Sequence, residues 1–420
     1  MQKKTPIVAF ILVTSLFFMW GLANNMTDTL LAAFKRIMSM TDFQTSWIQI
    51  AFYGSYFCLA LPAAIFIKRF TYKAGILLGL GMFIAGGLLF YPASQTMVYG
   101  HFLGALFILA GGLSVLETTA NPYILAMGPE ESATRRLNFA QSFNPIGSIT
   151  GVVISKFFIL AHLNQADAAQ RALMTHEELV VIRSQELNAT MGPYVGVAFF
   201  LLFLWITIAL VKMPRASDES PRIDLLPTLK RLFANKKYVT GVVAQFFYVG
   251  AQIGVWSFTI RYVMQELGTN EQQSSSYYIA ALILFTLLRF VFTGLMKFFS
   301  PGKLLTVSAS MAIFLTLLAI AGSGHFGVYA LVAISGCMSL MFPTIYGISL
   351  QGLGQDTKIG ASGLIMAILG GAVLTAIQGQ VSDLSGSIKI AFVVPLVCFI
   401  VIAFYGALNI KNGRRASQTV

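Results

Sequence analysis

The sequence predicts an all-α membrane protein with twelve transmembrane helices arranged in two bundles of six. Only 10% of its 420 residues are charged, 56% are hydrophobic, and the mean hydropathy is +0.75. A soluble domain carries about 25% charged residues, so a soluble protein of this length would have too few polar side chains for its surface. The apolar stretches are too long for the alternating strands of an outer-membrane barrel, so the spans are predicted to be helices.

Twelve apolar segments, each close to the ~20 residues that cross a bilayer, supply these helices. Their approximate limits are 6–33, 45–67, 74–94, 97–127, 137–161, 192–212, 238–265, 274–298, 303–322, 325–350, 359–383 and 389–410. A polar stretch at 162–191 contains a predicted surface helix from Asp167 to Leu187. The predicted domains are an N-terminal six-helix bundle at 1–212, a cytoplasmic linker at 213–237 and a C-terminal six-helix bundle at 238–420.

The two halves of the chain resemble each other weakly at an offset of 229 residues. Phe18, Gly21, Lys68 and Phe70 recur as Phe247, Gly250, Lys297 and Phe299. Two related six-helix halves in the same orientation are typical of a two-bundle transporter. Glycines inside the spans are expected to allow close helix contacts. They include Gly75, Gly79, Gly86, Gly87, Gly363, Gly370 and Gly371.

The distribution of lysine and arginine predicts the orientation of the chain. If both termini are cytoplasmic, the inside loops hold 20 of the 28 Lys and Arg residues and the outside loops hold six. The other two, Lys156 and Arg289, fall within spans. This bias predicts cytoplasmic termini. Because the net charge of +12 belongs to the loops and no basic run is interleaved with aromatic residues, no nucleic-acid partner is expected.

Two acidic residues, Asp28 in the first span and Glu117 in the fourth, lie well inside apolar segments. Charging a carboxylate in hydrocarbon costs at least ~2.5 kcal/mol, and the middle of the first four spans contains no Lys or Arg to pair with them. Each acid either exchanges a proton in a wet cavity, as proton coupling requires, or stays protonated and only bonds a neighbouring helix. We favour proton coupling, without assigning which acid takes up the proton first. At the 229-residue offset the acids correspond to Ser257 and Tyr346, so proton exchange is predicted in the N-terminal half alone.

Neutral amide and aromatic side chains accompany the two acids on a few spans. Those predicted to bind substrate, together with Glu117, are Trp20, Asn25, Asn121, Gln141, Asn144, Gln245, Tyr248, Gln252 and Trp256. The last four recur at spacings of 3, 4 and 4, which places them on one helical face. Amides bind hydroxyl groups and aromatic rings bind the C–H faces of a sugar ring, so this set favours a neutral sugar. For each single amide, a hydrogen bond between helices is the alternative.

The remaining polar side chains indicate no metal site and no catalytic site. The cysteines and histidines lack metal-ligand spacing, and no Ser/His/Asp set is present, so we expect no metal, no cofactor other than the coupling proton and no enzymatic activity. A phosphate or carboxylate substrate would require a cation at the site. Arg289, near the cytoplasmic end of the eighth span, is interpreted as a structural or gating charge, with a substrate contact as the alternative.

Several strings in the chain resemble the fucose–proton symporter family of the major facilitator superfamily. They are FFMWGLANNMTDTLL (17–31), YKAGILLGL (72–80), LETTANPY (116–123), RLNFAQSFN (136–144), AQFFYVGAQ (244–252) and LGQDTK (353–358). The resemblance implies the major facilitator fold, with Asp28 and Glu117 as the groups that couple protonation to sugar binding. It implies sugar contacts for Trp20, Asn25, Gln141 and Asn144. The chain departs from the family at Phe342, where the family carries a tyrosine.

The sequence therefore predicts a proton-coupled symporter that imports a neutral monosaccharide, L-fucose or a related hexose, by alternating access. The expected partners are the sugar, the proton and the lipid bilayer. A monomer in a bacterial inner membrane, with both termini cytoplasmic, is expected. One alternative is a proton-driven exporter of sugars or apolar compounds, which the amides on the first, fifth and seventh spans disfavour. Another is a sugar sensor that binds its ligand without transporting it.

Overall fold

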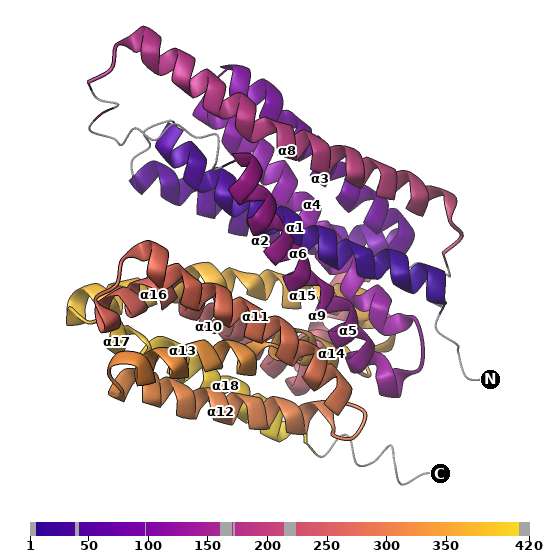
Figure 1. The fold of residues 1–420 in the computed structure, drawn as a ribbon. Helices are drawn as coiled ribbons and strands as arrows, with labels where there is room; N and C mark the ends of the chain where they lie inside the picture. The colour runs from indigo at the N-terminus through magenta and orange to yellow at the C-terminus, as the bar shows by residue number, and fades with distance from the viewer. Residues whose placement is uncertain are drawn as a thin grey trace, which may run out of the picture. The chain divides into compact units, whose positions relative to one another are not determined.

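The computed structural model describes residues 6–37, 42–96, 98–159, 170, 173–213 and 224–410. The regular secondary structure within these ranges is helical, so the predicted all-α class is confirmed (Figure 1). Ten helical stretches within them are long and apolar enough to cross a membrane. They match ten of the twelve predicted segments, and the fifth and sixth segments differ from the prediction.

The helices follow one another along the chain in two series, one in each half. In the first half of the chain they are α1 (Ile7–Ile37), α2 (Asp42–Arg69), α3 (Tyr72–Thr96), α4 (Tyr99–Ala126), η1 (Glu130–Ser132), α5 (Ala133–Gln141), α6 (Phe143–Ile154), the π-helical turn η2 (Ser155–Ile159) and α8 (His176–Leu210). In the second half they are α9 (Leu225–Ala234), α10 (Lys236–Leu267), α11 (Glu271–Leu295), α12 (Pro301–Ala321), α13 (Gly324–Met338), α14 (Met341–Leu350), η4 (Gly354–Asp356), α15 (Thr357–Met366), η5 (Ala367–Leu369), α16 (Gly370–Ser385), α17 (Ile388–Ala391) and α18 (Val393–Leu408).

The fifth predicted segment, 137–161, is not one continuous helix. It is divided into α5, α6 and η2, with Ser142 between α5 and α6. Pro145 gives the physical reason, because proline has no N–H to donate to the carbonyl four residues earlier and its ring crowds that turn. At the break, the Ser142 hydroxyl donates to the carbonyl of Asn138 at 2.8 Å.

The predicted surface helix from Asp167 to Leu187 and the predicted span at 192–212 are not separate elements, although the apolar segment Val195–Leu210 matches the predicted sixth span. Within the described residues one helix, α8, runs continuously from His176 to Leu210. Thr175 caps its beginning, since the Thr175 hydroxyl accepts from the backbone N–H of Glu178 and the Glu178 carboxylate accepts from the backbone N–H of Thr175. This reciprocal capping box fixes where the helix begins. Residues 160–169, which would include Asp167, lie outside the described part.

The chain divides into two compact units. The N-terminal unit contains Ile7–Ala120 and Phe143–Arg215, and the C-terminal unit contains Asn121–Ser142 and Ala216–Val420. The end of α4 and all of α5 therefore group with the second half of the chain. The predicted bundle boundaries at 212 and 238 stay a prediction, and each unit is described separately below.

In the N-terminal unit, glycines allow two helix pairs to approach each other at backbone distance. A Cβ on Gly147 of α6 would overlap the carbonyl of Phe18 on α1, and a Cβ on Gly21 of α1 would overlap the carbonyl of Asn144 on α6. On α3, a Cβ on Gly79 or on Gly86 would likewise overlap atoms of α4. Small residues are the usual solution for helices that pack closely in membranes.

The C-terminal unit repeats this device at the equivalent crossing. A Cβ on Gly370, at the start of α16, would overlap the carbonyl of Phe246 on α10, and Gly250 on α10 faces the side chain of Leu374 on α16. Gly21 and Gly250 are a pair of the predicted 229-residue repeat, so both members of this pair lie where two helices cross at close range.

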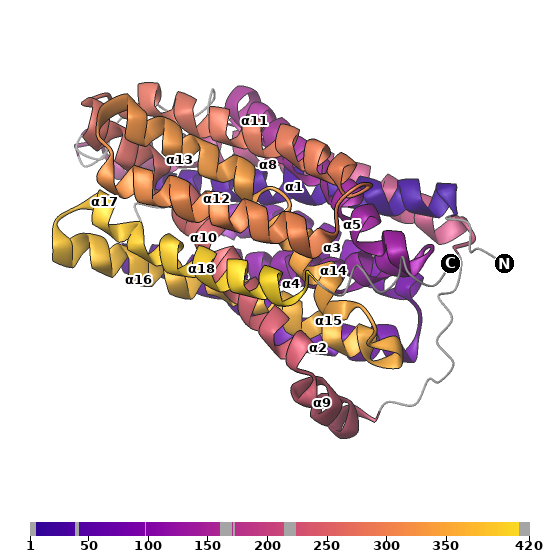
Figure 2. The ribbon, with the colours of Figure 1, turned by 90° about the horizontal axis from the view of Figure 1, so that it is seen from below.

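Most of the described part of the predicted linker forms α9, and its last two residues, Lys236 and Lys237, begin α10. The Arg231 guanidinium binds Asp356 in η4 with two bonds, from Nε to Oδ2 at 2.8 Å and from Nη2 to Oδ1 at 2.7 Å. Such a two-bond pair has a defined geometry, so it fixes α9 in the C-terminal unit. Figure 2 shows α9 near the beginning of α15.

Two basic residues of predicted cytoplasmic loops close the ends of helices. Lys73 Nζ donates to the carbonyls of Ala209 and Val211 at 2.7 and 2.8 Å, where α8 ends. Arg136 Nη2 donates to the carbonyl of Leu125 at 2.7 Å, where α4 ends. The last carbonyls of a helix lack partners within it and carry partial negative charge, so both cations are stabilising there.

Replacement of Gly147 tests the close crossing of α1 and α6. In the variant Gly147→Ala, the added methyl group would overlap the Phe18 carbonyl. We expect a loss of about 1–3 kcal/mol of stability from overpacking, seen as a lower melting temperature in detergent. The matched control is Gly104→Ala on α4, where a Cβ would meet no atom within 4 Å. The control is expected to be neutral or slightly stabilised, and an equal effect of both variants would contradict the packing argument.

Candidate functional site

Glu117 on α4 is buried, with 3% of its surface exposed, and bonds a tyrosine on a neighbouring helix. The Tyr56 hydroxyl, on α2, donates to Glu117 Oε1 at 3.1 Å. The Trp20 side chain, on α1, lies close to the same hydroxyl. An indole N–H can only donate, so Trp20 faces the Tyr56 oxygen as a donor. Two predicted site residues thus lie next to Tyr56, which was not predicted.

The pairing of α2 with α4 fixes the position of the bond between Tyr56 and Glu117. The Ser55 hydroxyl on α2 donates to the carbonyl of Phe107 at 2.8 Å, and the Ser114 hydroxyl on α4 donates to the carbonyl of Tyr56 at 3.1 Å. Both serines are fully buried. In an apolar environment such bonds are costly to leave unmade, so they set the register of the two helices.

Asp28, the other predicted coupling acid, lies on α1, but its side chain is outside the described part of the structure. Its sequence position is eight residues, or just over two helical turns, after Trp20. Its role in proton coupling stays a prediction.

Asn121 and Gln141 are brought together. Asn121 lies one helical turn after Glu117 on α4, and Gln141 is the last residue of α5. Gln141 Nε2 donates to Asn121 Oδ1 at 2.7 Å, and both side chains are buried. A hydrogen bond between helices is the structural role that each amide has as an alternative to substrate binding. The same bond also places two amides next to each other, as binding of a polyhydroxyl compound requires.

Asn144 and Asn25 lie at the close crossing of α1 and α6. Asn144 Nδ2, on α6, donates to the carbonyl of Phe17 on α1 at 3.3 Å. The Cβ of Asn25, on α1, is 3.2 Å from the place of a Cβ on Gly151 of α6. Both asparagines are half-buried. The crossing therefore holds two of the predicted amides in the N-terminal unit.

The predicted face of α10 is real, but two of its four residues are used in packing. The Tyr248 hydroxyl donates to the carbonyl of Met338 at 3.1 Å, and Trp256 Nε1 donates to the Ser335 hydroxyl at 3.3 Å. The Trp256 ring also lies edge-on to Phe285, with centroids 5.1 Å apart. For Tyr248 and Trp256 the structure thus shows bonds between helices. Gln252, one turn before Trp256, is half-buried.

Gln245 is the exception on this face of α10. It is fully buried, and neither Oε1 nor Nε2 has a hydrogen-bond partner in the described part of the structure. Gln378 on α16, which was not predicted, has the same property, and its Oε1 fills the space beside Gly254 of α10. A buried unsatisfied amide costs about 1–3 kcal/mol, so both side chains favour binding a hydrogen-bonding ligand or water.

The intramembrane cation Arg289 lies on α11 and is buried, with 4% of its surface exposed. Its guanidinium donates to the backbone carbonyls of Gln141 and Ser339, and it stacks 4.5 Å from the ring centroid of Phe285. Its two hydrogen bonds are therefore with the protein backbone.

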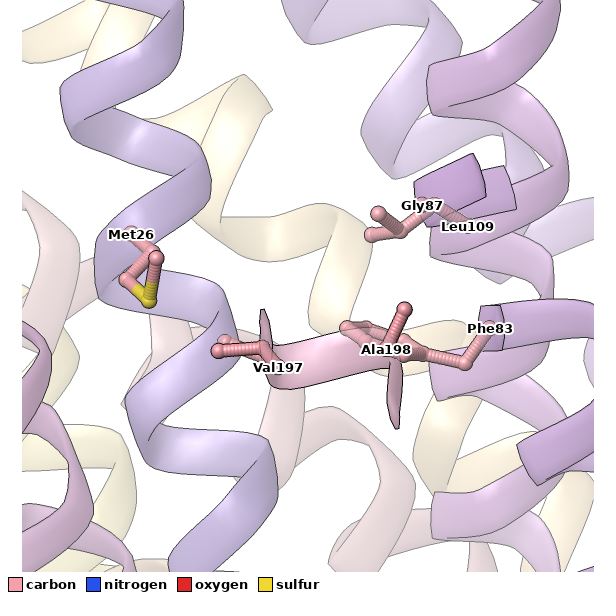
Figure 3. A pocket seen from close by; sticks show the side chains of 7 residues that line it. Met26, Phe83, Gly87, Leu109, Val197 and Ala198 are labelled. Carbon is pink, nitrogen blue, oxygen red and sulfur yellow. The ribbon is translucent and has the colours of Figure 1, made fainter. Parts of the chain in front are cut away.

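Figure 3 shows a pocket in the N-terminal unit that cannot recognise hydroxyl groups. It is lined by Ala23, Met26, Phe83, Gly87, Leu109, Val197 and Ala198. These side chains offer no strong donor or acceptor. No group of three His, Cys, Asp or Glu side chains among the described residues is placed to hold a metal ion. The polar candidates therefore remain the Glu117, Asn121–Gln141 and Gln245 neighbourhoods.

The contrast between Gln245 and Gln141 can be tested through stability. In Gln245→Met, an unsatisfied amide is replaced by an apolar side chain of similar length, so we expect stability unchanged or raised by up to about 3 kcal/mol without ligand. In the matched variant Gln141→Met, the 2.7 Å bond is lost and Asn121 loses a donor, so a decrease of about 1–3 kcal/mol is expected. Thermal unfolding in detergent measures both. A lower melting temperature for Gln245→Met than for Gln141→Met would contradict the assignment.

Known proteins resemble this chain over nearly its whole length. The L-fucose-proton symporter of Haemophilus influenzae is 42% identical over 96% of this chain and 97% of its own. A glucose/galactose transporter of Brucella abortus is 33% identical over 95% of this chain and 93% of its own. The crystal structure of the Escherichia coli fucose:proton symporter superposes with a TM-score of 0.90 at 37% identity, covering 96% of this chain and 99% of that one.

The family assignment rests on both sequence and structure. The sequence matches the Major Facilitator Superfamily over residues 9–374, which include the predicted site residues. The all-helical architecture and the repeated close crossings of α1 with α6 and of α10 with α16 are consistent with two related halves. The chain belongs to the major facilitator superfamily.

Proposed function

We propose that the protein is a proton-coupled symporter that imports a neutral hexose, with L-fucose as the leading substrate. The observation that carries the proposal is the buried Glu117 carboxyl group, which bonds Tyr56 and lies one turn from the Asn121–Gln141 amide pair. A carboxyl group at this depth is expensive to ionise, so its protonation state depends on its surroundings. Binding of a sugar beside it changes those surroundings, which is the condition for coupling.

L-fucose is favoured over other hexoses by the names of the relatives. The relative that is 42% identical is an L-fucose-proton symporter, whereas the glucose/galactose transporter is 33% identical. Because the second group also covers nearly the whole chain, glucose or galactose is the second candidate substrate. The amides at Asn121, Gln141 and Gln245 suit the hydroxyl groups of either sugar.

Proton and sugar move together in the proposed cycle. Protonation of Glu117, with Asp28 as the second proposed acid, favours sugar binding from outside. The two halves of the fold, with proposed boundaries at 1–212 and 238–420, then rearrange so that the site opens to the inside. Sugar and proton leave there, and the empty carrier returns.

The setting of the transporter is proposed from its family and its charges. We place it in a bacterial inner membrane as a monomer, with both termini cytoplasmic as the Lys and Arg distribution predicts. In this proposal the transporter requires the lipid bilayer and no partner protein. No enzymatic activity and no cofactor besides the proton are part of the proposal.

Counterflow in proteoliposomes tests the substrate. Vesicles loaded with unlabelled L-fucose, D-galactose, D-glucose or a pentose are diluted into labelled L-fucose, and only transported sugars produce transient accumulation of label. We expect L-fucose to give the strongest signal. If D-galactose or D-glucose exceeds it when the label is changed accordingly, the second candidate replaces the first. If no sugar gives counterflow or competes for binding, the symporter proposal is wrong.

Replacement of the buried acid tests the coupling. In Glu117→Gln the side chain keeps its size but cannot exchange a proton, so we expect uptake driven by an inside-alkaline pH gradient to fall at least ~10-fold, while counterflow persists. Asp28→Asn is expected to lose gradient-driven uptake as well. The control is Asp383→Asn, which changes an exposed acid at the end of α16. Full gradient-driven uptake by both Glu117→Gln and Asp28→Asn would refute the assignment.

A further inference from the structure

Pro145 releases a backbone carbonyl at the break between α5 and α6. In a continuous helix, the residue at position 145 would donate its N–H to the carbonyl of Gln141, but proline has no N–H. The Gln141 carbonyl therefore needs a donor from elsewhere. Because the side chain of Gln141 bonds Asn121, this carbonyl belongs to a residue of the proposed sugar site.

Pro343 releases a second carbonyl at the break between α13 and α14. The tenth span is interrupted at Ser339 and Leu340, and the residue at 343 would donate to the carbonyl of Ser339 if it were not proline. The carbonyl of Met338, next to it, already receives the Tyr248 hydroxyl at 3.1 Å. The Ser339 carbonyl likewise needs a donor.

Arg289 supplies both missing donors. Its Nη1 donates to the Gln141 carbonyl at 2.9 Å, and its Nε donates to the Ser339 carbonyl. The three residues lie in the same compact unit, which contains Asn121–Ser142 as well as the second half of the chain. One guanidinium thus joins the ends of two broken helices.

The electrostatic surroundings of Arg289 make its contact stable only while both carbonyls accept from it. Within the described residues it forms no ion pair, and its charge is offset by two backbone carbonyls and the face of Phe285. A buried cation without a carboxylate costs several kcal/mol unless its hydrogen bonds are all kept. The arrangement is therefore stable only while both helix breaks lie within reach of the same side chain.

We propose that Arg289 is a positioning residue that holds the end of α5, and with it Gln141, against the break in the tenth span, and that transport requires this contact to be released and remade. The proposal rests on the proposed function for its role in transport, but its structural part stands apart from the substrate. Lysine cannot replace arginine here, because one ammonium group lacks the rigid fork that reaches two carbonyls in different directions.

Restoring a backbone donor provides the sharpest test. In Pro343→Ala the N–H at position 343 can bond the Ser339 carbonyl, which makes the bond from Arg289 Nε redundant. The native Cys337, 9% exposed and two residues before Ser339, reports on opening of the break through its rate of alkylation by N-ethylmaleimide. The background carries Cys58→Ala and Cys398→Ala, so that Cys337 alone reacts.

In this background, Arg289→Lys is expected to raise the alkylation rate of Cys337 at least ~5-fold. The same variant is expected to lower gradient-driven L-fucose uptake at least ~10-fold, while the affinity for L-fucose changes less than ~3-fold. The double variant Arg289→Lys with Pro343→Ala is expected to return alkylation to within ~2-fold of the Pro343→Ala single variant. The control Arg261→Lys removes another arginine stacked on a phenylalanine, but an exposed one, and should change neither rate. Monodisperse elution and thermal unfolding establish that each variant is folded.

Three results would overturn the proposal. An unchanged alkylation rate in Arg289→Lys would show that the break does not depend on Arg289. A loss of L-fucose binding of at least ~10-fold, without a change in alkylation, would make Arg289 a direct substrate contact. Strictly additive effects of Arg289→Lys and Pro343→Ala on alkylation would separate the guanidinium from the proline break. If the unmodified protein transports no L-fucose, the proposed function fails, whereas the alkylation series still decides the role of Arg289.

Discussion

A polar group inside an apolar medium must find its partner within the protein, and the other features of this fold depend on that constraint. The constraint is strictest where a helix is interrupted, because each interruption exposes backbone carbonyls. At the breaks before Pro145 and Pro343 the partner is one guanidinium, and beside the second break it is the Tyr248 hydroxyl. The breaks are thus places where side chains from other helices are bound into the backbone.

The same constraint explains why the proposed site is built from bonded pairs of side chains. Glu117 bonds Tyr56, and Gln141 bonds Asn121, while the helices that carry them are set in register by the buried hydroxyls of Ser55 and Ser114. A sugar that enters such a site exchanges its bonds with water for bonds that replace or extend those between helices. Substrate binding and helix contacts therefore use the same hydrogen-bond donors and acceptors. This shared use is a physical basis for coupling sugar binding to the arrangement of the helices.

The sequence predicted the helical class and most of the spans because hydrophobic length is a local property that a single chain displays directly. It also placed Glu117, Asn121 and Gln141 correctly as buried polar residues of neighbouring spans. It could not find Tyr56, since nothing in the sequence distinguishes this tyrosine from Tyr53 until α2 is paired with α4.

Other features also required the three-dimensional arrangement. The split of the fifth span was readable in principle from Pro145, but a proline inside a span is also compatible with a continuous helix such as α8, which contains Pro193. The partners of Tyr248 and Trp256 on α13 depend on how helices pack, which no spacing within α10 encodes. Gln378 was not predicted because nothing in the sequence distinguishes it from Gln380 on the same helix until α16 packs against Gly254 of α10.

The basic residues of the predicted cytoplasmic loops that close helix ends have a consequence for how the chain enters the membrane. Lys73 and Arg136 count toward the charge asymmetry that directs topology, and each also caps a helix whose final carbonyls would otherwise be bare. During synthesis the charge of Lys73 acts on the orientation of the chain before the helix that it caps exists, since α8 ends more than a hundred residues after Lys73. Each of these side chains therefore acts first as a topology signal during insertion and later as a helix cap in the folded protein. Replacing it with a neutral residue to alter the topology would also lower the stability of the folded protein.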